Sequence, residues 1–479
     1  MSAKVPEKIL ANTFIGKRIT ITQSMNQFAF KLLKVFCSRH QSDSRNMCFS
    51  PLEVFNSYVM LLIGSKGITE TQLEDMLCLK NFNNPKRYKE LMELRKWIIK
   101  SNHEIMVYGT VIYVDRKLQM QPDYLEKVKN MFEIKPKPVD FTKIDECVNL
   151  INKEAKAMTD GLIEGVIHQK DLQEEKEIKL IISNAVFFRG YWLFKFGDIH
   201  KEPFHYASGK KSAPIDMMSH LGYHRYYYDD YLRADTVSVA YASSDIRMVI
   251  ILPKSINDEA IYLVDLLDAE RLSKLFWQLQ HSPKSLTELT IPRFALDAHK
   301  VSLQKSVQQM GSTSIYDRDQ AELGGICAND RLHLTKLVHK AFILVDERGS
   351  QTPSIKPLEK TEYLKRSDRN IVAPTTTARA PLQKTDKNSN TSNDSNNSNE
   401  KSMDEIVDDE RKTNETITKI IPFKANHPFL FLILDKITGV VCLMGVFADP
   451  TEIMEVVREH DLSDAEITKL LAEHDQLQN

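Results

Sequence analysis

The chain has 479 residues, 42% of them hydrophobic and 27% charged, and its 64 Lys and Arg residues balance its 65 Asp and Glu residues to a net charge of −1. This composition suits a folded chain with a sizeable core, and the balanced charge excludes a global attraction to nucleic acid or to an anionic membrane. The six cysteines form no Cys-x-x-Cys pair and no apolar run is long enough to span a bilayer, so we expect no metal, no cofactor and no transmembrane helix.

Residues 1–24 form an N-terminal segment without a secretion signal. Lys4, Lys8, Lys17 and Arg18 interrupt every apolar run there, so the segment has no hydrophobic signal core. This absence and the scattered cysteines predict an intracellular protein.

Helices are predicted between Met25 and Leu79. Phe28, Leu32, Leu33 and Phe36 recur at helical spacing. A second helix should begin at Ser50-Pro51, since proline is favoured in a first helical turn, and a third should begin near Thr69.

Strands dominate the remainder of the predicted domain. Their runs are apolar or alternating and rich in β-branched and aromatic residues. The expected strands are Ile105–Val114, Leu180–Phe188, Val237–Tyr241, Met248–Leu252, Leu286–Ile291, Ala341–Val345, Phe429–Leu434 and Val440–Phe447. Asp435 to Gly439 suits a hairpin turn between the last two. Helices and strands are mixed rather than alternating, which predicts an α+β fold with large sheets.

Two segments stand outside this pattern. Residues 351–421 contain no convincing helix or strand, and residues 384–402 contain so few apolar groups that we expect them to be disordered. Residues 451–479 carry two short amphipathic stretches and are predicted to form a helical tail. That tail either packs on the body or docks a protein partner.

Four motifs follow one another along the chain: Asn46–Leu52, Asn184–Trp192, Val338–Phe342 running on to Glu347–Ser350, and Phe423–Phe429 running on to Gly439 and Met444-Gly445. In this order and spacing they resemble the motifs of the serpins, a family of serine protease inhibitors. The chain resembles the family over residues 25–450. No motif of a hydrolase, metalloprotease, P-loop or dinucleotide-binding enzyme competes with this resemblance, so we expect no enzymatic activity.

The resemblance implies a fold with a large central, mostly parallel β-sheet, smaller β-sheets and surrounding helices. It also implies an exposed reactive loop that a protease attacks to form an acyl-enzyme. The cut loop then inserts into the sheet as a new strand and releases stored conformational free energy.

The same resemblance assigns roles to individual residues. Ser50, Asn184 and His339 would form a polar shutter where the sheet opens, and in apolar surroundings these three hydrogen-bonding side chains must satisfy each other. Glu53 stands nearby where the family has a small hydroxyl residue, so it needs a partner, such as His339, or must turn outward. A second group, the breach, where the loop first enters the sheet, would consist of Trp192, Arg293 and Glu347.

The hinge of the loop would contain Glu347, Gly349 and Ser350, and the segment after it departs from the family pattern. Inhibitory members continue with small residues, whereas this chain has Pro353, Lys356 and Pro357. Proline cannot donate to a central β-ladder, and alternation from Ser350 turns Lys356 inward.

The cleavage site is predicted at Tyr363, Leu364, Lys365 and Arg366 by counting forward from the hinge. Counting back from Phe423 points instead to Asn414, so the loop carries an insertion of about fifty residues. Arg369, Arg379 and Arg411 are further basic candidates for a trypsin-like protease.

The sequence therefore predicts a monomeric serpin-type inhibitor of a serine protease. The alternative is a non-inhibitory serpin that serves as a protease substrate or as a binding scaffold through its loop or tail. Family membership also leaves an extracellular location open, since four Asn-x-Ser/Thr sites lie in the loop.

Overall fold

The structure is a computed structural model. It describes residues 21–39, 46–80, 87–102, 106–159, 161–188, 190–242, 244–258, 260–297, 303–328, 331–350 and 419–452. The chain divides into one compact unit of residues 1–356 and 421–479 and a second unit of residues 357–420. The account below concerns the first unit, to which all described residues except 419 and 420 belong.

Three helices follow one another in the N-terminal part: α2 (Ile21–Arg39), α3 (Pro51–Ile63) and α4 (Gly67–Met76). The predicted start of α3 is confirmed: Ser50 is its N-cap, its hydroxyl accepts the backbone N–H of Glu53, and Pro51 occupies the first turn. α3 is buried along almost its whole length, which explains why apolar residues occur all around it.

A five-stranded sheet has the order β11-β12-β4-β2-β3. Its strands are β11 (Phe294–Asp297), β12 (Lys336–Val345), β4 (Leu180–Phe188), β2 (Met106–Asp115) and β3 (Lys137–Val139). β12 runs parallel to β4 and β2 parallel to β3, whereas β11 with β12 and β2 with β4 are antiparallel. The expectation of a mostly parallel sheet is therefore wrong: the sheet is mixed.

The larger sheet has nine strands in the order β1-β16-β15-β9-β8-β7-β10-β14, with β6 paired to β7. The strands are β1 (Met47–Phe49), β16 (Val441–Phe447), β15 (Phe429–Asp435), β9 (Ile246–Pro253), β8 (Ala234–Ala240), β7 (Lys211–Asp229), β10 (Lys284–Pro292), β14 (Ile421–Lys424) and β6 (Asp198–Tyr206). The predicted hairpin between β15 and β16 is confirmed, with Gly439 at a φ of 71°.

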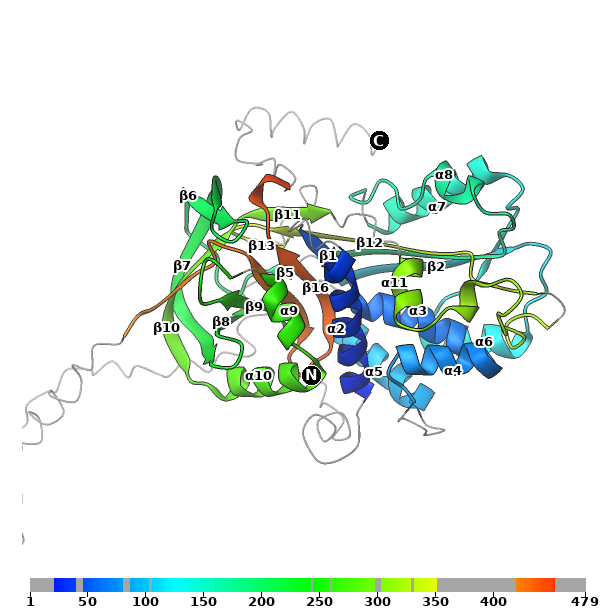
Figure 1. Ribbon diagram of the computed structural model, residues 1–479, viewed down its shortest axis with the longest axis horizontal. Helices are drawn as coiled ribbons and strands as arrows, with labels where there is room; N and C mark the ends of the chain where they lie inside the picture. Colours follow the sequence, from blue (N-terminus) through cyan, green and yellow to red (C-terminus); the bar gives the residue numbers. More distant parts are fainter. Residues whose placement is uncertain are drawn as a thin grey trace, which may run out of the picture. The chain divides into compact units, whose positions relative to one another are not determined.

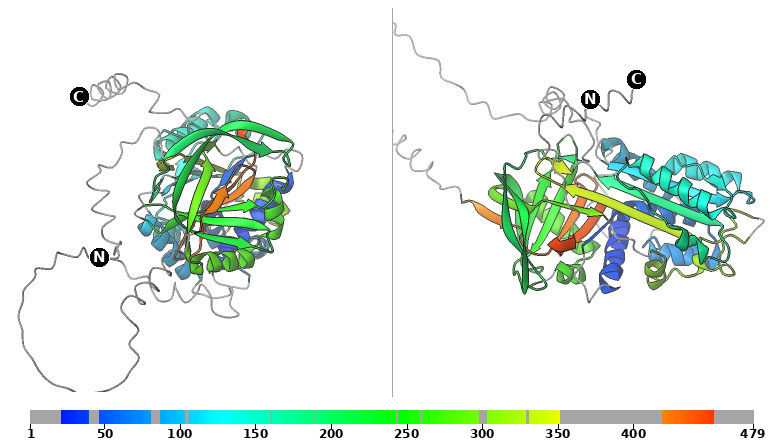
Figure 2. Two further views of the ribbon diagram at one scale, coloured as in Figure 1. Left: turned by 90° about the vertical axis from the view of Figure 1, so that its left-hand side faces the viewer. Right: turned by 90° about the horizontal axis from the view of Figure 1, so that it is seen from above.

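Helices cover both faces of the five-stranded sheet (Figures 1 and 2). α7 (Ile144–Met158) and α8 (Gln169–Gln173) lie on one face, and α3 lies on the other with α6 (Pro122–Phe132). The remaining helices are α5 (Arg87–Asn102), α9 (Ala260–Leu266), α10 (Ala269–His281) and α11 (Leu303–Gln309), with short 3₁₀ turns at Ser314–Tyr316 and Pro450–Glu452. Every residue of β4 is buried between these two helical layers. The architecture is α+β, as predicted.

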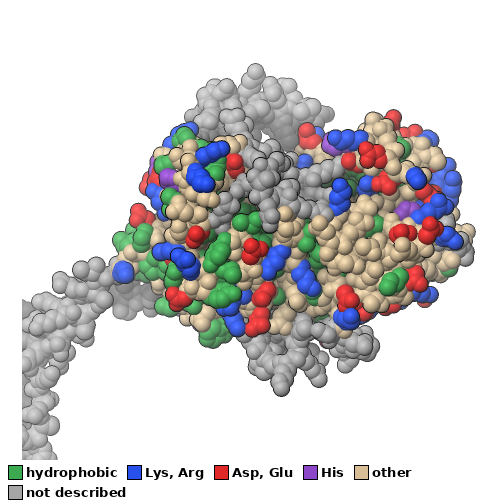
Figure 3. Space-filling model, viewed as in Figure 1, with side chains coloured by type: hydrophobic (Ala, Val, Ile, Leu, Met, Phe, Trp, Pro, Cys, Tyr) green, Lys and Arg blue, Asp and Glu red, His purple; other side chains and the backbone are tan. Residues whose placement is uncertain are grey.

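The surface carries both signs of charge side by side. In Figure 3 the basic and acidic side chains are interspersed, and hydrophobic side chains gather where Figure 1 places α9, α10 and the nine-stranded sheet. Within the described ranges no helix combines the length and apolarity that a bilayer crossing requires.

Candidate functional site

A closed seam between β12 and β4 lies at the centre of the five-stranded sheet. The two strands pair directly, residues 336–343 with residues 181–188, so no strand lies between them. Beyond β12 the chain turns and forms β13 (Gly349–Ser350), which pairs with β5 (Gly190–Tyr191). The described chain resumes at residue 419 and enters β14, which runs parallel to β10. The predicted loop range therefore ends one residue inside β14.

Asp346 organises the turn that leads into the loop. Its carboxylate accepts the backbone N–H groups of Arg348 (2.8 Å) and Gly349 (2.9 Å), and its own backbone N–H donates to the carbonyl of Gly349 (2.7 Å). Burial raises the pKa of this carboxyl group. Asp346 was not among the residues predicted from the sequence, although an aspartate three residues before a glycine at a strand end is typical of such a turn.

Gly349 occupies a position that no side chain would fit. Its φ is 151°, and a Cβ atom there would lie 1.9 Å from the carbonyl oxygen of Gly190 and 2.7 Å from the Cα of Tyr191. The close approach of β13 to β5 therefore requires glycine, in addition to any freedom that loop movement needs. Ser350 is the second residue of β13.

Trp192 lies directly beneath this turn and is 0% exposed. Its indole N–H donates to the carbonyl of Asp346 (2.8 Å), and its backbone N–H donates to the carbonyl of Arg348 (2.8 Å). The indole also stacks on Tyr241, with ring centroids 4.4 Å apart. Trp192 thus ties the start of the loop to the end of β5.

Arg293 and Glu347 also meet at this turn. Arg293 Nε and Glu347 Oε2 lie 3.5 Å apart, and the two side chains are only 6% and 16% exposed. An ion pair so poorly solvated is sensitive to the loss of either partner, because the remaining charge would stay buried. The structure therefore brings together all three residues assigned to the breach.

Ser50 and His339 meet at the N-terminus of α3. His339 Nε2 accepts the backbone N–H of Ser50 (3.0 Å), and the hydroxyl of Ser50 donates to the carbonyl of Cys442 on β16 (2.7 Å). Burial lowers the pKa of His339 to about 3. The ring is therefore neutral, and its Nδ1 has no hydrogen-bond partner among the described residues.

Asn184 belongs to a separate hydrogen-bond group. It stands opposite His339 in the strand register, but its amide donates to Thr110 Oγ1 (2.8 Å) and Ser57 Oγ (3.0 Å). Ser50 and His339 are thus bonded to each other, whereas Asn184 is bonded to Thr110 and Ser57. The expectation that all three residues satisfy one another is therefore wrong.

Glu53 is buried in this second group, at 3% exposure. Its Oε2 accepts the hydroxyl of Thr110 on β2 (2.8 Å), and its Oε1 accepts the amide of Asn56 (3.1 Å). The predicted pairing of Glu53 with His339 is wrong, because His339 accepts a hydrogen bond from Ser50, the N-cap of α3, instead.

Thr110, Ser57 and Asn56 were not predicted from the sequence. Thr110 stands on another element, so no local pattern indicates it. Asn56 and Ser57 lie one helical turn after Glu53 on α3, and that spacing could have indicated them.

The remaining sequence-based assignments lie outside the described residues. They are the cleavage candidates Tyr363, Leu364, Lys365 and Arg366, the further basic candidates of the loop, and the tail. Among the residues that are described, no three His, Cys, Asp or Glu side chains cluster as a metal site would require.

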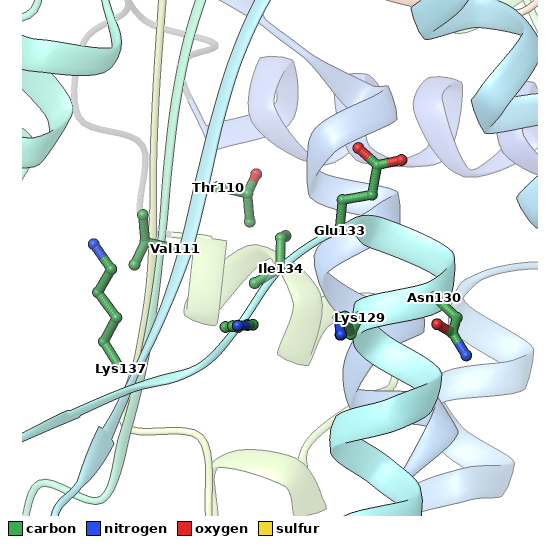
Figure 4. A pocket seen from close by; sticks show the side chains of 8 residues that line it. Thr110, Val111, Lys129, Asn130, Glu133, Ile134 and Lys137 are labelled. Atoms are coloured by element: carbon green, nitrogen blue, oxygen red, sulfur yellow. The ribbon is translucent and has the colours of Figure 1, made fainter.

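Two cavities flank the sheets. One of about 580 Å³ lies between β2 and the end of α6 and is lined by Thr110, Val111, Lys129, Asn130, Glu133, Ile134, Lys135 and Lys137 (Figure 4). Thr110, whose hydroxyl binds Glu53, is therefore part of the wall of this cavity. The second, of about 700 Å³, is lined by residues of α10, β7 and β8, among them Tyr223, His224, Arg225 and Trp277.

Comparison with known proteins agrees with this geometry. A mouse protein, leukocyte elastase inhibitor A, is 26% identical over 331 residues, covering 68% of this chain and 85% of the relative. Uncleaved ovalbumin superposes with a TM-score of 0.67 at 19% identity, over 90% of this chain and all of ovalbumin. Human thyroxine-binding globulin complexed with thyroxine superposes with a TM-score of 0.70 at 18% identity, over 91% of this chain and 99% of that protein. The family model described as serpin, serine protease inhibitor, matches residues 23–450. The chain therefore belongs to the serpin family.

Proposed function

We propose that this serpin presents its loop as bait to a trypsin-like serine protease, with the scissile bond at Lys365 or Arg366. One observation carries the proposal: β12 and β4 pair directly, so the sheet retains the place that an inserted strand would occupy. The breach residues and Gly349 lie near the end of this seam at residues 343 and 188, where a cut loop would begin to enter.

Cleavage would begin as in any serine protease reaction. The protease serine attacks the scissile carbonyl, the peptide bond breaks, and the new amino terminus departs while the acyl-enzyme ester remains. If the loop inserts before water hydrolyses this ester, the protease is carried along and trapped. If hydrolysis is faster, the chain behaves as a substrate.

The relative rates of loop insertion and of ester hydrolysis decide whether the chain acts as an inhibitor or as a substrate. Pro353 and Pro357 lack the N–H that a central strand donates, and Lys356 would bring a charge into the sheet. These three residues slow or prevent insertion, so they favour the substrate or scaffold alternative, while family membership favours inhibition.

The test is to mix the full chain with trypsin and to look for a denaturant-resistant complex on a gel. A band of higher mass supports inhibition, whereas a nicked chain with full trypsin activity supports the substrate alternative. A K365A/R366A variant tests the cleavage site, because the proposed site is wrong if that variant is cut or trapped at the same rate. Trypsin without its catalytic serine is the matched control and should give no complex.

A second candidate function is the binding of a small amphipathic anion in the 700 Å³ cavity. His224 favours it: the ring is only 6% exposed, yet its Nε2 has no partner among the described residues. Arg225 and Lys284 add positive charge, and Tyr223 and Trp277 add aromatic surface. The globulin complexed with thyroxine supports a ligand role for this fold.

Tryptophan fluorescence tests this second candidate, with an aromatic carboxylate such as thyroxine as the probe. Saturable quenching that is lost in His224→Ala would support it, and no quenching would exclude the binding of aromatic carboxylates.

A further inference from the structure

Two histidines of β7 meet on one face of their strand. His220 and His224 stand four residues apart, so their Cα atoms are separated by roughly 13 Å at the rise of an extended strand. Their ring centroids nevertheless lie only 5.4 Å apart. The two side chains therefore lean toward each other along the strand, over the residue midway between them.

Gly222 is that residue, and its lack of a side chain provides the space in which the rings meet. A Cβ atom at this position would lie 2.3 Å from Nε2 of His220. The backbone there does not itself require glycine, since Gly222 is not among the glycines with a positive φ. Nε2 of His220 thus occupies volume that the side chain of any other residue would fill.

One nitrogen of each ring is left without a partner. Nε2 of His220 and Nε2 of His224 are buried and have no hydrogen-bond partner among the described residues. Each ring instead bonds a backbone carbonyl, that of Lys195 for His220 and that of Ser238 for His224, so the bonded atom is Nδ1. Nδ1 then carries the proton and Nε2 presents its lone pair. Metal-binding histidines donate their other N–H in this way.

The rings are also spaced as two ligands of one metal ion. With zinc–nitrogen distances of about 2.0–2.1 Å and a tetrahedral angle, the centroids of two imidazole ligands lie about 5.2 Å apart. The 5.4 Å between His220 and His224 agrees with this value. Both rings are in the neutral form that a metal requires, because burial lowers their pKa, to about 4 for His224.

We infer that His220 and His224 form a binding site for a divalent metal ion of the zinc and copper class, with Nε2 of each ring as a ligand. Ions of this class prefer imidazole, whereas Mg²⁺ and Ca²⁺ prefer oxygen ligands. Among the described residues no third His, Cys, Asp or Glu joins the pair, so water or an external donor takes the other coordination positions. Two protein ligands, with the charge of Lys284 near His224, predict weaker binding than that of a closed structural site.

This site goes beyond the proposed inhibitor function and does not depend on it. It shares His224 with the cavity of about 700 Å³, whereas His220 is not among the described residues that line that cavity. The two histidines therefore allow metal binding to be separated from the binding of an organic anion.

Calorimetric titration of the full chain with ZnCl₂ tests the site. His220→Ala and His224→Ala should each weaken zinc binding at least about 10-fold, because the loss even of an outer partner of a ligand costs that much. His200→Ala is the matched control, since His200 lies exposed on β6 beside Glu202 and is a competing site for zinc. The inference is overturned if the natural chain does not bind zinc, if it binds Mg²⁺ as well, or if binding is lost in His200→Ala and persists in His220→Ala.

Gly222→Ala tests the geometry while it keeps both ligands. The added methyl group displaces the tip of the His220 ring, so zinc binding should again fall at least about 10-fold, with the melting temperature as the check that the fold is kept. Unchanged zinc binding in a folded Gly222→Ala variant would refute the site, and His220→Ala decides the question if Gly222→Ala does not fold.

Thyroxine quenching separates the metal site from the cavity. His220→Ala should lose zinc binding and keep any quenching that the natural chain shows, whereas His224→Ala should lose both. A joint loss in His220→Ala would show that the substitution disturbs the whole region and would remove the support for a metal site. Because zinc is titrated without protease or organic ligand, failure to trap trypsin or to bind thyroxine leaves the zinc result unaffected.

Discussion

Replacing the three obstructive residues that follow the hinge, in what we call the hinge variant, should favour strand insertion. The variant carries Pro353→Ala, Lys356→Ala and Pro357→Ala. The seam pairs residues 336–343 with residues 181–188, so an inserted strand that starts after Ser350 reaches to about residue 358 and includes all three positions. Every residue of β4 is buried, so both faces of the sheet are covered and Lys356 would be buried whichever face it took.

The size of the effect follows from these positions. Each proline leaves one carbonyl of β4 or β12 without a donor, at about 1–3 kcal/mol. An inward Lys356 without a counter-ion adds several kcal/mol, unless it loses its proton. The total of roughly 5–10 kcal/mol is comparable with the net stability of a folded domain.

Thermal denaturation of trypsin-cleaved protein measures this difference. The cleaved variant should unfold at least about 10 °C above the cleaved natural chain, at roughly 2–4 °C per kcal/mol for a large domain. A control with Pro374→Ala, Pro381→Ala and Lys384→Ala makes the same types of change beyond the reach of the seam and should show no gain. The reasoning is refuted if the hinge variant and the natural chain melt together after cleavage, or if the control gains equally.

Three further predictions concern the described residues. Because His339 has a pKa of about 3 in the folded chain against an ordinary value of 6.5, its contribution is complete above pH 6.5 and is lost as the pH falls toward 3. Urea unfolding should therefore lose about 2 kcal/mol from this residue between pH 6.5 and pH 5, and His339→Gln should remove that share; an unchanged pH dependence would contradict it. Gly349→Ala should displace β13 from β5 and speed amide exchange at Gly190 and Tyr191, whereas normal protection there would show that the turn can adapt. Trp192→Phe removes the indole donor to Asp346 and should lower the unfolding free energy by about 2–4 kcal/mol, while a loss below about 0.5 kcal/mol would show that this hydrogen bond matters little.

Local patterns in the sequence determined most of the secondary structure near the seam. The run Leu180–Phe188 is apolar without interruption, and such a run is typical of a strand buried on both faces, as β4 is. Ser50-Pro51 identified the start of α3, and the turn before Gly439 identified the last hairpin, because caps and turns depend on a few adjacent residues. The resemblance in four motifs was enough to name the family that the match over residues 23–450 then showed.

Tertiary structure alone decided how the polar residues of the seam are partnered. Ser50, Asn184 and His339 could be placed near one another from the resemblance, but their separation into two hydrogen-bond groups depends on the register of β12, β4 and β2. Glu53 shows the reason most clearly. Its donor, Thr110, stands 57 residues away on another element, and no spacing along the chain indicates which distant hydroxyl a folded sheet will bring to a buried carboxylate.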